Sequence, residues 1–335
     1  HRSLVRLIKT ASILGREVPI ALLSHMLRNP VKGSSCETLQ REALWSPLQE
    51  LLYLFQHSMI QETIYEMQMN KVRTKLHALA VRSLEAIHKD RLAVHAATLA
   101  HHCEMAGWIH KSREYHLIGA QEARQNYELE QALFHYQNAQ RLSKKKKEQF
   151  EMELEIASLQ NIRGETREFK DCLKRLEEEL SSLRSSRLRI RYELLHSINQ
   201  ERAGNLESAL KGLEHCLHLA KKGKFRDLTC ESLLKLGAFF QSRGDSKRAL
   251  DLVSQGLEFS QESGESRLRI QIRNQMAGLE ESSGNWRAAL KEYEALLKQA
   301  RLDNSQVDIY HTLGRIGVLH FNAGRVRQAE SRYRE

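Results

Sequence analysis

The sequence predicts an all-α protein built largely from repeated antiparallel helix pairs, and three observations support this fold class. A turn-like pattern recurs every 40 residues, with its glycine at Gly204, Gly244, Gly284 and Gly324. A small residue lies seven positions before each glycine, and an alanine lies five positions after it. All three prolines precede residue 48, so nothing interrupts long helices in the remainder. The recurrence of the glycine and of its flanking small residues at one fixed period indicates a repeat protein.

Each 40-residue unit is expected to fold as a helix, a tight turn and a second helix. Glycine ends a helix in the left-handed conformation at little steric cost. The small residues are Ser197, Gly237, Ala277 and Gly317, and we expect the alanine of the second helix to face them. Because one pair cannot bury both of its faces, neighbouring pairs stack into a solenoid with a concave surface. Gly164 keeps the phase although Phe169 replaces the alanine, so five units are expected.

The spacing of glycine, small residue and alanine resembles the tetratricopeptide repeat, in a 40-residue form longer than the usual 34. The resemblance covers residues 188–335 and lacks the proline that often ends each unit. It implies that the first helix of each pair lines a concave groove that binds a partner. The candidate groove residues are Arg191, Leu194, Ile198, Glu201, Glu231, Leu234, Ala238, Gln241, Gln271, Asn274, Gly278, Glu281, His311, Gly314, Val318 and Phe321.

The predicted groove is of mixed character and partly apolar. It lacks the lysine and asparagine clamp of receptors for carboxylate tails. A peptide or a partner helix with an apolar stripe suits it better. The alternative is that this face packs against another domain of the same polypeptide.

The amino-terminal part has a different pattern. Apolar spacing predicts a helix over 4–14 that ends at Gly15, a second over 20–27 and a third over 37–44. The apolar run 51–55 is compatible with one or two short strands. Residues 1–65 are therefore expected to form a winged-helix-like unit. Residues 66–143 are expected to form irregular connecting helix pairs, with turns at Gly107 and Tyr127, and residues 148–335 the regular repeats.

A second resemblance lies in residues 7–17 (LIKTASILGRE), 53–65 (YLFQHSMIQETIY) and 73–77 (RTKLH). These strings resemble the region after the nucleotide-binding domain in bacterial signal-transduction ATPases with numerous domains, and the resemblance covers residues 4–140. In that family the ATPase leads through a winged helix into tetratricopeptide repeats, and relatives are fused to adenylate cyclase, Ser/Thr kinase or transcription-regulator domains. The G-x-x-x-x-G-K-[ST] phosphate loop is absent. We therefore expect no ATP hydrolysis and no cofactor here, and ATP or ADP only in a full-length protein.

His57 is the most specific residue that the second resemblance singles out. In related ATPases a winged-helix histidine contacts the phosphate of the bound nucleotide, so the resemblance implies that His57 senses nucleotide state. A ring nitrogen can donate a hydrogen bond to a phosphate oxygen. The alternative is a structural histidine that packs or caps at the junction between strand and helix.

Metal binding and disulfides are not expected. His95, His101, His102 and Cys103 lie near one another in sequence, but His95 and His102 would be about 10 Å apart along a helix, too far for one ion without other ligands. Histidines on a helix surface are the better interpretation. The five cysteines are scattered with no C-x-x-C pair, which fits a reducing cytoplasm.

The formal net charge of +10 does not by itself indicate nucleic acid, because basic and acidic residues alternate along helical faces. No run of 18 apolar residues predicts a membrane span. The chain starts without methionine and stops inside a predicted helix, so we expect it to be a segment of a longer protein.

The sequence favours a non-catalytic regulatory segment of a larger bacterial signalling ATPase, located in the cytoplasm, whose repeats bind a partner or effector. A free-standing repeat scaffold for protein assembly is the first alternative. A winged-helix transcriptional regulator is the second, although the helix over 20–27 offers only His25 and Arg28 as polar readers of DNA. No set of residues with the spacing of a catalytic site indicates an enzyme.

Overall fold

The computed structural model describes residues 2–181, 183–263, 266–303 and 305–335. These residues form two compact units, His1–Met152 and Glu153–Glu335. Most of the described residues are helical, as the predicted fold class requires. No helix in the described ranges combines the length and the hydropathy needed to cross a lipid bilayer.

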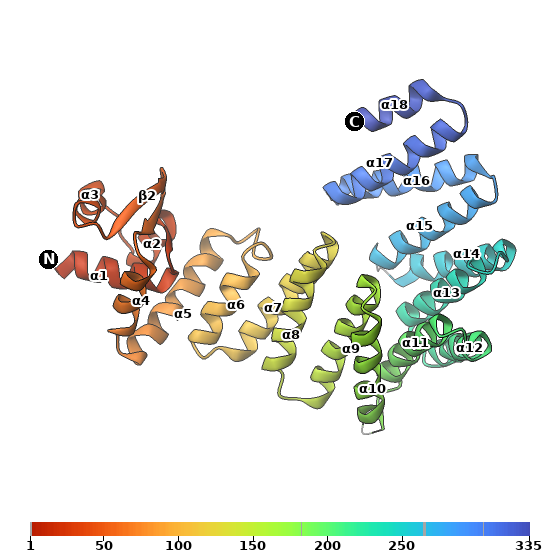
Figure 1. Cartoon of the computed structure of the whole chain (residues 1–335), viewed down its shortest axis with the longest axis horizontal. Helices are drawn as coiled ribbons and strands as arrows, with labels where there is room; N and C mark the ends of the chain where they lie inside the picture. The colour runs from red at the N-terminus through yellow and green to blue at the C-terminus, as the bar shows by residue number, and fades with distance from the viewer. Residues whose placement is uncertain (1, 182, 264–265, 304) are drawn as a thin grey trace. The chain divides into compact units, whose positions relative to one another are not determined.

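The first unit begins with a small bundle of helices against a three-stranded antiparallel sheet (Figure 1). Its elements are α1 (Arg2–Ala11), the 3₁₀ turn η1 (Ser12–Leu14), β1 (Glu17–Pro19), α2 (Ile20–Leu27), α3 (Gly33–Arg41), β2 (Trp45–Gln49) and β3 (Leu52–Phe55). β3 lies between β1 and β2, with Val18 opposite Tyr53 and Trp45 opposite Phe55. The buried core of this bundle includes Leu7, Val18, Leu23, Trp45 and Phe55. The predicted winged-helix-like unit is present, and its third helix starts earlier than expected.

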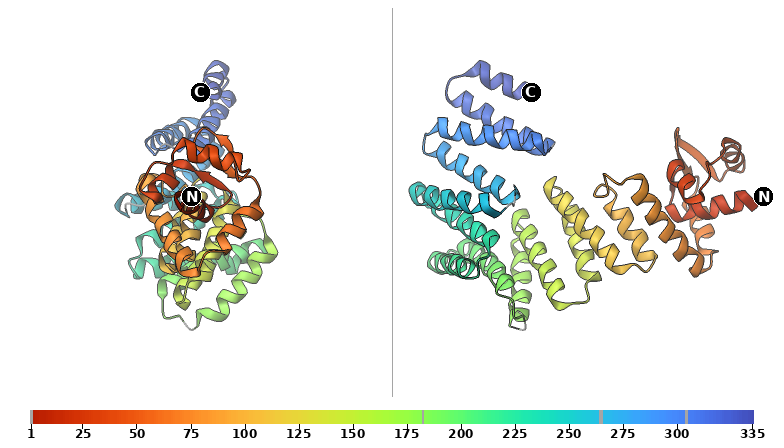
Figure 2. Two further views of the ribbon diagram at one scale, coloured as in Figure 1. Left: turned by 90° about the vertical axis from the view of Figure 1, so that its left-hand side faces the viewer. Right: turned by 180° about the vertical axis from the view of Figure 1, so that it is seen from behind.

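The helices that follow come in antiparallel neighbours. The first unit continues with α4 (Ser58–Glu66), α5 (Asn70–Ile87), α6 (Ala96–Met105), α7 (Ile109–Gln125) and α8 (Leu129–Leu142). Then come α9 (Lys146–Arg163), α10 (Thr166–Leu180), α11 (Ser186–Arg202), α12 (Leu206–Lys222), α13 (Arg226–Gln241), α14 (Ser246–Ser263), α15 (Ser266–Ser282), α16 (Trp286–Leu302), α17 (Gln306–Asn322) and α18 (Val326–Arg334). Figure 2 shows the pairs of the second unit stacked in sequence order.

The repeated glycines occupy equivalent positions in the turns. Gly164, Gly204, Gly244, Gly284 and Gly324 all have φ between 74° and 84°. At Gly204 the glycine N–H donates to the Glu201 carbonyl and the Asn205 N–H donates to the Gln200 carbonyl, and the other four turns repeat this pattern. These two bonds define the Schellman motif, which satisfies the last carbonyls of the first helix. The 40-residue period is therefore a period in structure as well as in sequence.

A left-handed turn of this kind also forms without glycine, at Arg28, Ala43, Tyr127 and Lys224, and the one at Tyr127 lies between α7 and α8. Tyr127 has φ of 58°, and the next N–H, that of Glu128, donates to the carbonyl of Ala123. The left-handed conformation costs a residue with a side chain about 1–2 kcal/mol. The turn predicted at Tyr127 is thus formed, at an energetic cost that the glycine turns do not carry.

Small residues let the two helices of a pair approach closely, but their nearest neighbours differ from the expectation. A Cβ added at Gly237 would lie 2.6 Å from Cγ2 of Val253, and one added at Gly317 would lie 2.6 Å from the ring of Tyr333. Val253 and Tyr333 each follow the repeat alanine by four residues. The alanines themselves are buried. At Gly237 and Gly317 the small residue therefore accommodates mainly the side chain one turn beyond the alanine, and at Gly237 the added Cβ would also lie 3.5 Å from the Ala249 carbonyl oxygen.

The first helices of successive pairs lie on the inner side of the second unit. α11 contacts α13, and α13 contacts α15, whereas the second helices α12, α14 and α16 make no comparable contact with one another in the described ranges. Helices on the inner side of a curved stack are closer together than those on the outer side. The expected assignment of the first helix to the concave face agrees with this difference.

Candidate partner-binding surface

The predicted groove residues divide into three groups by burial. Leu194 is buried in a core cluster with Ile190 and Leu213, so it does not line an open surface. Half-buried residues are Arg191, Ile198, Glu201, Glu231, Leu234, Gln241, Asn274, Gly278, Glu281 and Gly314. Exposed residues are Ala238, Gln271, His311, Val318 and Phe321. The structure thus leaves part of the predicted set accessible to a partner.

Three of the predicted charged residues are held by ion pairs between neighbouring first helices. Arg191 of α11 binds Glu155 of α9 at 2.6 Å. Glu201, at the end of α11, binds Arg243 at 3.0 Å. Glu281 of α15 binds Arg315 of α17 at 2.7 Å. Because these charges are already compensated, they act first as ties between adjacent pairs.

Arg315 belongs to a three-residue network. Its Nη2 donates to Glu281 Oε2 at 2.7 Å, and its Nε donates to the Tyr293 hydroxyl at 3.0 Å. The Tyr293 hydroxyl in turn donates to Glu281 Oε2 at 3.2 Å. Burial raises the pKa of Tyr293, so this hydroxyl keeps its proton at neutral pH. The network joins α15, α16 and α17.

Apolar exposure on the inner side is concentrated on α17. Tyr310, Val318 and Phe321 are 63%, 39% and 61% exposed. With Gly314 they are spaced i, i+4, i+8 and i+11, which places them on one face of the helix. A Cβ at Gly314 would meet nothing within 4 Å, so the face is open at its middle. Tyr310 was not among the predicted residues, although this spacing could have identified it.

His57 is exposed at the junction between β3 and α4, as the sequence indicates. It occupies the position before the first turn of α4 and makes no side-chain cap bond. Arg16 and the first residues of α4 line an open pocket of about 480 Å³ with it. Free N–H groups at a helix start and a nearby guanidinium are suited to an anion. Whether His57 senses a nucleotide stays a prediction.

The histidines of α6 differ from the expectation. His102 and Cys103 are buried, so they are not surface residues of the helix. His102 Nδ1 lies 2.9 Å from Nδ1 of His77, a residue of α5 that sequence spacing did not connect to it. Burial lowers the pKa of His77 to about 4 and that of His102 to about 3. His95 lies apart from them and its ring packs on that of His88, with 3.9 Å between centroids.

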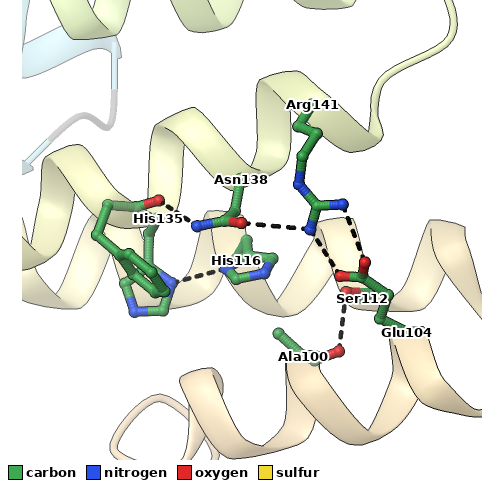
Figure 3. Close-up of polar contacts among 8 residues, drawn as sticks. Ala100, Glu104, Ser112, His116, His135, Asn138 and Arg141 are labelled. Atoms are coloured by element: carbon green, nitrogen blue, oxygen red, sulfur yellow. Dashed lines mark hydrogen bonds and ion pairs between the residues drawn. The ribbon is translucent and has the colours of Figure 1, made fainter.

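A second buried histidine pair joins α7 and α8. His116 Nδ1 and His135 Nδ1 are 3.0 Å apart and share one hydrogen bond (Figure 3). Gly119 provides the space, because an added Cβ there would lie 2.7 Å from the His135 ring. Burial lowers the pKa of both residues, and that of His116 falls to about 4. Both rings are therefore neutral at pH 7.

An ion pair also joins α8 to α6. Figure 3 shows Arg141 of α8 donating to both carboxylate oxygens of Glu104 at the end of α6, at 2.9 and 2.8 Å. The guanidinium of Arg141 holds the pKa of Glu104 below its usual range. Ser112 Oγ donates to the carbonyl of Ala100 at 2.9 Å, which adds a buried bond between α6 and α7. Side-chain bonds thus tie three successive helices together.

Comparisons with known proteins identify solved structures with a similar fold. No family model matches the chain, and no curated protein matches it either. The chain is similar to the crystal structure of a signal-transduction ATPase with numerous domains and a tetratricopeptide-repeat sensor from Pyrococcus horikoshii, with a TM-score of 0.63 and 14% identity over 99% of the chain. It spans about half of that protein, 49% of its length.

A second solved structure gives a weaker match. The chain is similar to a Rap protein complexed with competence and sporulation factor, with a TM-score of 0.52, 14% identity and coverage of 82% of this chain and 89% of the other. At this identity the similarity establishes the fold alone. The expected resemblance to the winged-helix and tetratricopeptide-repeat region of signal-transduction ATPases is therefore confirmed as a likeness of fold, over almost the whole chain.

Proposed function

We propose that this chain is the non-catalytic regulatory segment of a larger signalling ATPase and that its repeats bind a peptide or partner helix with an apolar stripe. The proposal depends on a difference between charged and apolar side chains on the inner side of the second unit. Arg191, Glu201 and Glu281 there are held in ion pairs, while Tyr310, Val318 and Phe321 remain exposed on one face of α17.

The chemistry of the α17 face selects the kind of partner. Exposed aromatic and branched side chains at helical spacing fit the apolar face of an amphipathic segment. Aromatic residues contribute strongly to such contacts because they bury a large area with few rotatable bonds. His311 and Gln271 are exposed and provide polar contacts on the same inner side. A partner that depends on several carboxylates or phosphates is disfavoured, because the inner charges are already compensated.

The link to an ATPase is supported by the order of elements. A winged-helix-like unit precedes a helical repeat array, and the similar structure from Pyrococcus horikoshii belongs to a protein described as an ATPase with a repeat sensor. In the proposed arrangement, partner binding to the repeats changes the nucleotide state of a preceding ATPase domain. His57, Arg16 and the start of α4 form the surface that faces the phosphate of the nucleotide.

Peptide selection followed by affinity measurement tests the repeat surface. Random peptides of about 16 residues are selected against the chain, and their binding is measured by fluorescence anisotropy. Tyr310→Ala with Phe321→Ala is expected to weaken binding at least tenfold, about 1.4 kcal/mol, because both aromatic side chains are lost. Leu302→Ala removes an equally exposed apolar residue at the end of α16 and should change affinity less than twofold.

Two results would contradict this half of the proposal. Selected peptides could bind with the same affinity to the double variant, or they could lack an apolar stripe. Circular dichroism shows beforehand whether each variant keeps its helical content.

The ATPase half is tested separately. We expect the gene to encode a phosphate loop in the reading frame before His1, and His57→Ala in that full-length protein to alter the ADP-bound fraction without abolishing ATP binding. A reading frame without a phosphate loop would leave a free-standing repeat scaffold, with the same binding surface, as the function.

A further inference from the structure

Three histidines of the first unit converge where α5 packs against α6. His77 lies on α5, and His101 and His102 lie on α6. Their candidate ligand nitrogens all lie within 4.8 Å of one another. The Nδ1 atoms of His77 and His102 are 2.9 Å apart. An ion bound by several imidazoles requires this kind of convergence from different elements of the fold.

Tyr65 supplies an outer partner for one of these rings. Its hydroxyl lies 3.0 Å from Nε2 of His77. When Nε2 carries the proton and donates to Tyr65, the lone pair of His77 Nδ1 faces Nδ1 of His102. Metal-ligating histidines are commonly oriented through their second nitrogen in this way. Tyr65 is itself held by the guanidinium of Arg73, whose central carbon lies 4.9 Å from the ring centroid.

An open pocket of about 610 Å³ gives access to the cluster. Gln61, Tyr65, Met105 and the three histidines are among the residues that line it. His77 and His102 are buried at its base, whereas His101 is exposed. Solvent and small ions therefore reach the cluster from the side of His101, and the pocket has room for the water molecules or small anions that complete a coordination sphere.

The ligand set favours one class of metal. The cluster consists of imidazoles without a carboxylate. Imidazole suits Zn²⁺, Cu²⁺ and Ni²⁺, whereas Mg²⁺ and Ca²⁺ require oxygen ligands.

We propose that His77, His101 and His102 bind one divalent first-row transition-metal ion of the Zn²⁺ class. Zn–N distances near 2.0–2.1 Å in tetrahedral geometry separate two ligand nitrogens by about 3.3 Å. Nδ1 of His77 and Nδ1 of His102 would thus move apart by about 0.4 Å from their present 2.9 Å. The ion ties α5 to α6, and the Tyr65 contact extends that tie to α4.

Calorimetric titration of the whole chain tests the site. The protein is treated with EDTA, dialysed and titrated with ZnCl2 at pH 7.5, and one strong site per chain is expected. CoCl2 should give the visible absorption of a nitrogen-ligated ion, and MgCl2 and CaCl2 should give no saturable heat. His101→Ala is expected to lower Zn²⁺ affinity at least tenfold and to remove the rise in melting temperature that Zn²⁺ causes.

Two further variants make the assignment specific. His102→Asn removes a buried ligand and should abolish the strong site. If that variant does not fold, His101→Ala still tests the proposal, because the His101 side chain is exposed. His88→Ala is the matched control, since His88 packs on His95 in the same unit but lies outside the cluster, and its affinity should stay within twofold.

Three outcomes would overturn the site. The unmodified chain could show no Zn²⁺ binding tighter than about 100 µM, which would be too weak for a built site. His88→Ala could lower the affinity as much as His101→Ala does, which would assign the binding to scattered histidines. Mg²⁺ or Ca²⁺ could bind as tightly as Zn²⁺, which would exclude an imidazole site.

Discussion

The two compact units differ in the side chains that lie between their packed helices. In the second unit the close contacts of a pair place glycine against side chains that carry no imidazole, such as Gly237 against Val253, Gly317 against Tyr333 and Gly212 against Ser197. In the first unit Gly119 makes room for His135, which pairs with His116. Among the residues that the structure describes, the buried histidines lie in the first unit, apart from His320.

This difference has consequences for how each unit responds to its surroundings. A contact between aliphatic groups does not change with pH or with metal ions, because nothing in it titrates or coordinates. A buried imidazole pair is neutral and hydrogen-bonded, so its protonation places a positive charge in a desolvated site and destabilises the contact. We therefore expect the repeats to act as a constant frame for partner binding and the first unit to be the part that responds to conditions.

The largest effect is expected at the apolar contacts of the second unit. Gly237→Val places two methyl groups where Val253 already lies, and overpacking of this kind should lower the free energy of unfolding by about 3 kcal/mol. Gly278 lies in the interior of α15, where an added Cβ would meet nothing within 4 Å. Gly278→Ala should therefore raise the free energy of unfolding by about 0.5–1 kcal/mol. Urea unfolding followed by circular dichroism measures both. Equal effects at the two positions would mean that close helix approach is not what stabilises the pairs.

Low pH should destabilise the first unit more than the second. The pKa of His116 is about 4 in the folded protein and about 6.5 in the unfolded chain, so the unfolded chain binds more protons between these values. The free energy of unfolding of the first unit should therefore fall as pH is lowered from 6.5 to 4, by about 1–3 kcal/mol after allowance for the coupled His135. Hydrogen exchange at pH 7 and pH 5 should show protection lost in α7 and α8 before α13 and α14.

A variant identifies the source of this pH dependence. His116→Asn can still bond His135, because an asparagine amide occupies nearly the position of Nδ1, but it does not titrate. The stability of the variant should be lower at pH 7 and should change less between pH 6.5 and pH 4. An unchanged slope would show that the acid sensitivity arises elsewhere.

The turns give a smaller contrast, between a glycine and a residue with a side chain in the same left-handed conformation. Gly244→Ala puts a side chain at φ of 78° and should cost about 1 kcal/mol. Tyr127→Gly relieves a residue already at φ of 58° and should cost nothing or raise stability by up to about 1 kcal/mol. Thermal unfolding of the two variants measures the difference. If both substitutions destabilise equally, the contacts of the Tyr127 side chain outweigh the strain of its backbone.

The repeated elements could be predicted because their signals are local. A turn glycine, a small residue and an alanine lie within twelve positions of one another, and each acts on its own helix or on the helix next to it. The position of Leu194 could also have been predicted, since it lies four residues after Ile190 and three before Ser197, both buried on the core face. Its assignment to the groove followed the family pattern instead of that spacing.

Contacts between distant helices could not be predicted in the same way. Arg191, Glu201 and Glu281 find their partners 36, 42 and 34 residues away, and the pairing depends on how far each helix pair is rotated against the next. His77 lies 25 residues from His102, on another helix. No spacing rule joins such positions, so their roles as ties, or as members of one cluster, emerge only from the packed structure.

The ties between helix pairs should give the smallest effects, and they test whether both units use them alike. Glu281→Gln weakens the network with Arg315 and Tyr293 in the second unit, and Glu104→Gln weakens the bidentate pair with Arg141 in the first. Because both carboxylates are partly shielded, each substitution should cost about 0.5–1 kcal/mol.

Glu207→Gln provides the reference for these two ties. Glu207 pairs with Lys211 within α12, and both side chains are largely exposed, so its loss should not change stability measurably. Added salt should reduce the stability loss caused by Glu104→Gln more than the loss caused by Glu281→Gln. The reason is that the Arg141 side chain is 55% exposed, whereas that of Arg315 is 42% exposed. Equal costs at all three positions in urea unfolding would show that ion pairs between helices stabilise the stack no more than a surface pair does. The apolar contacts would then account alone for the stability of the second unit.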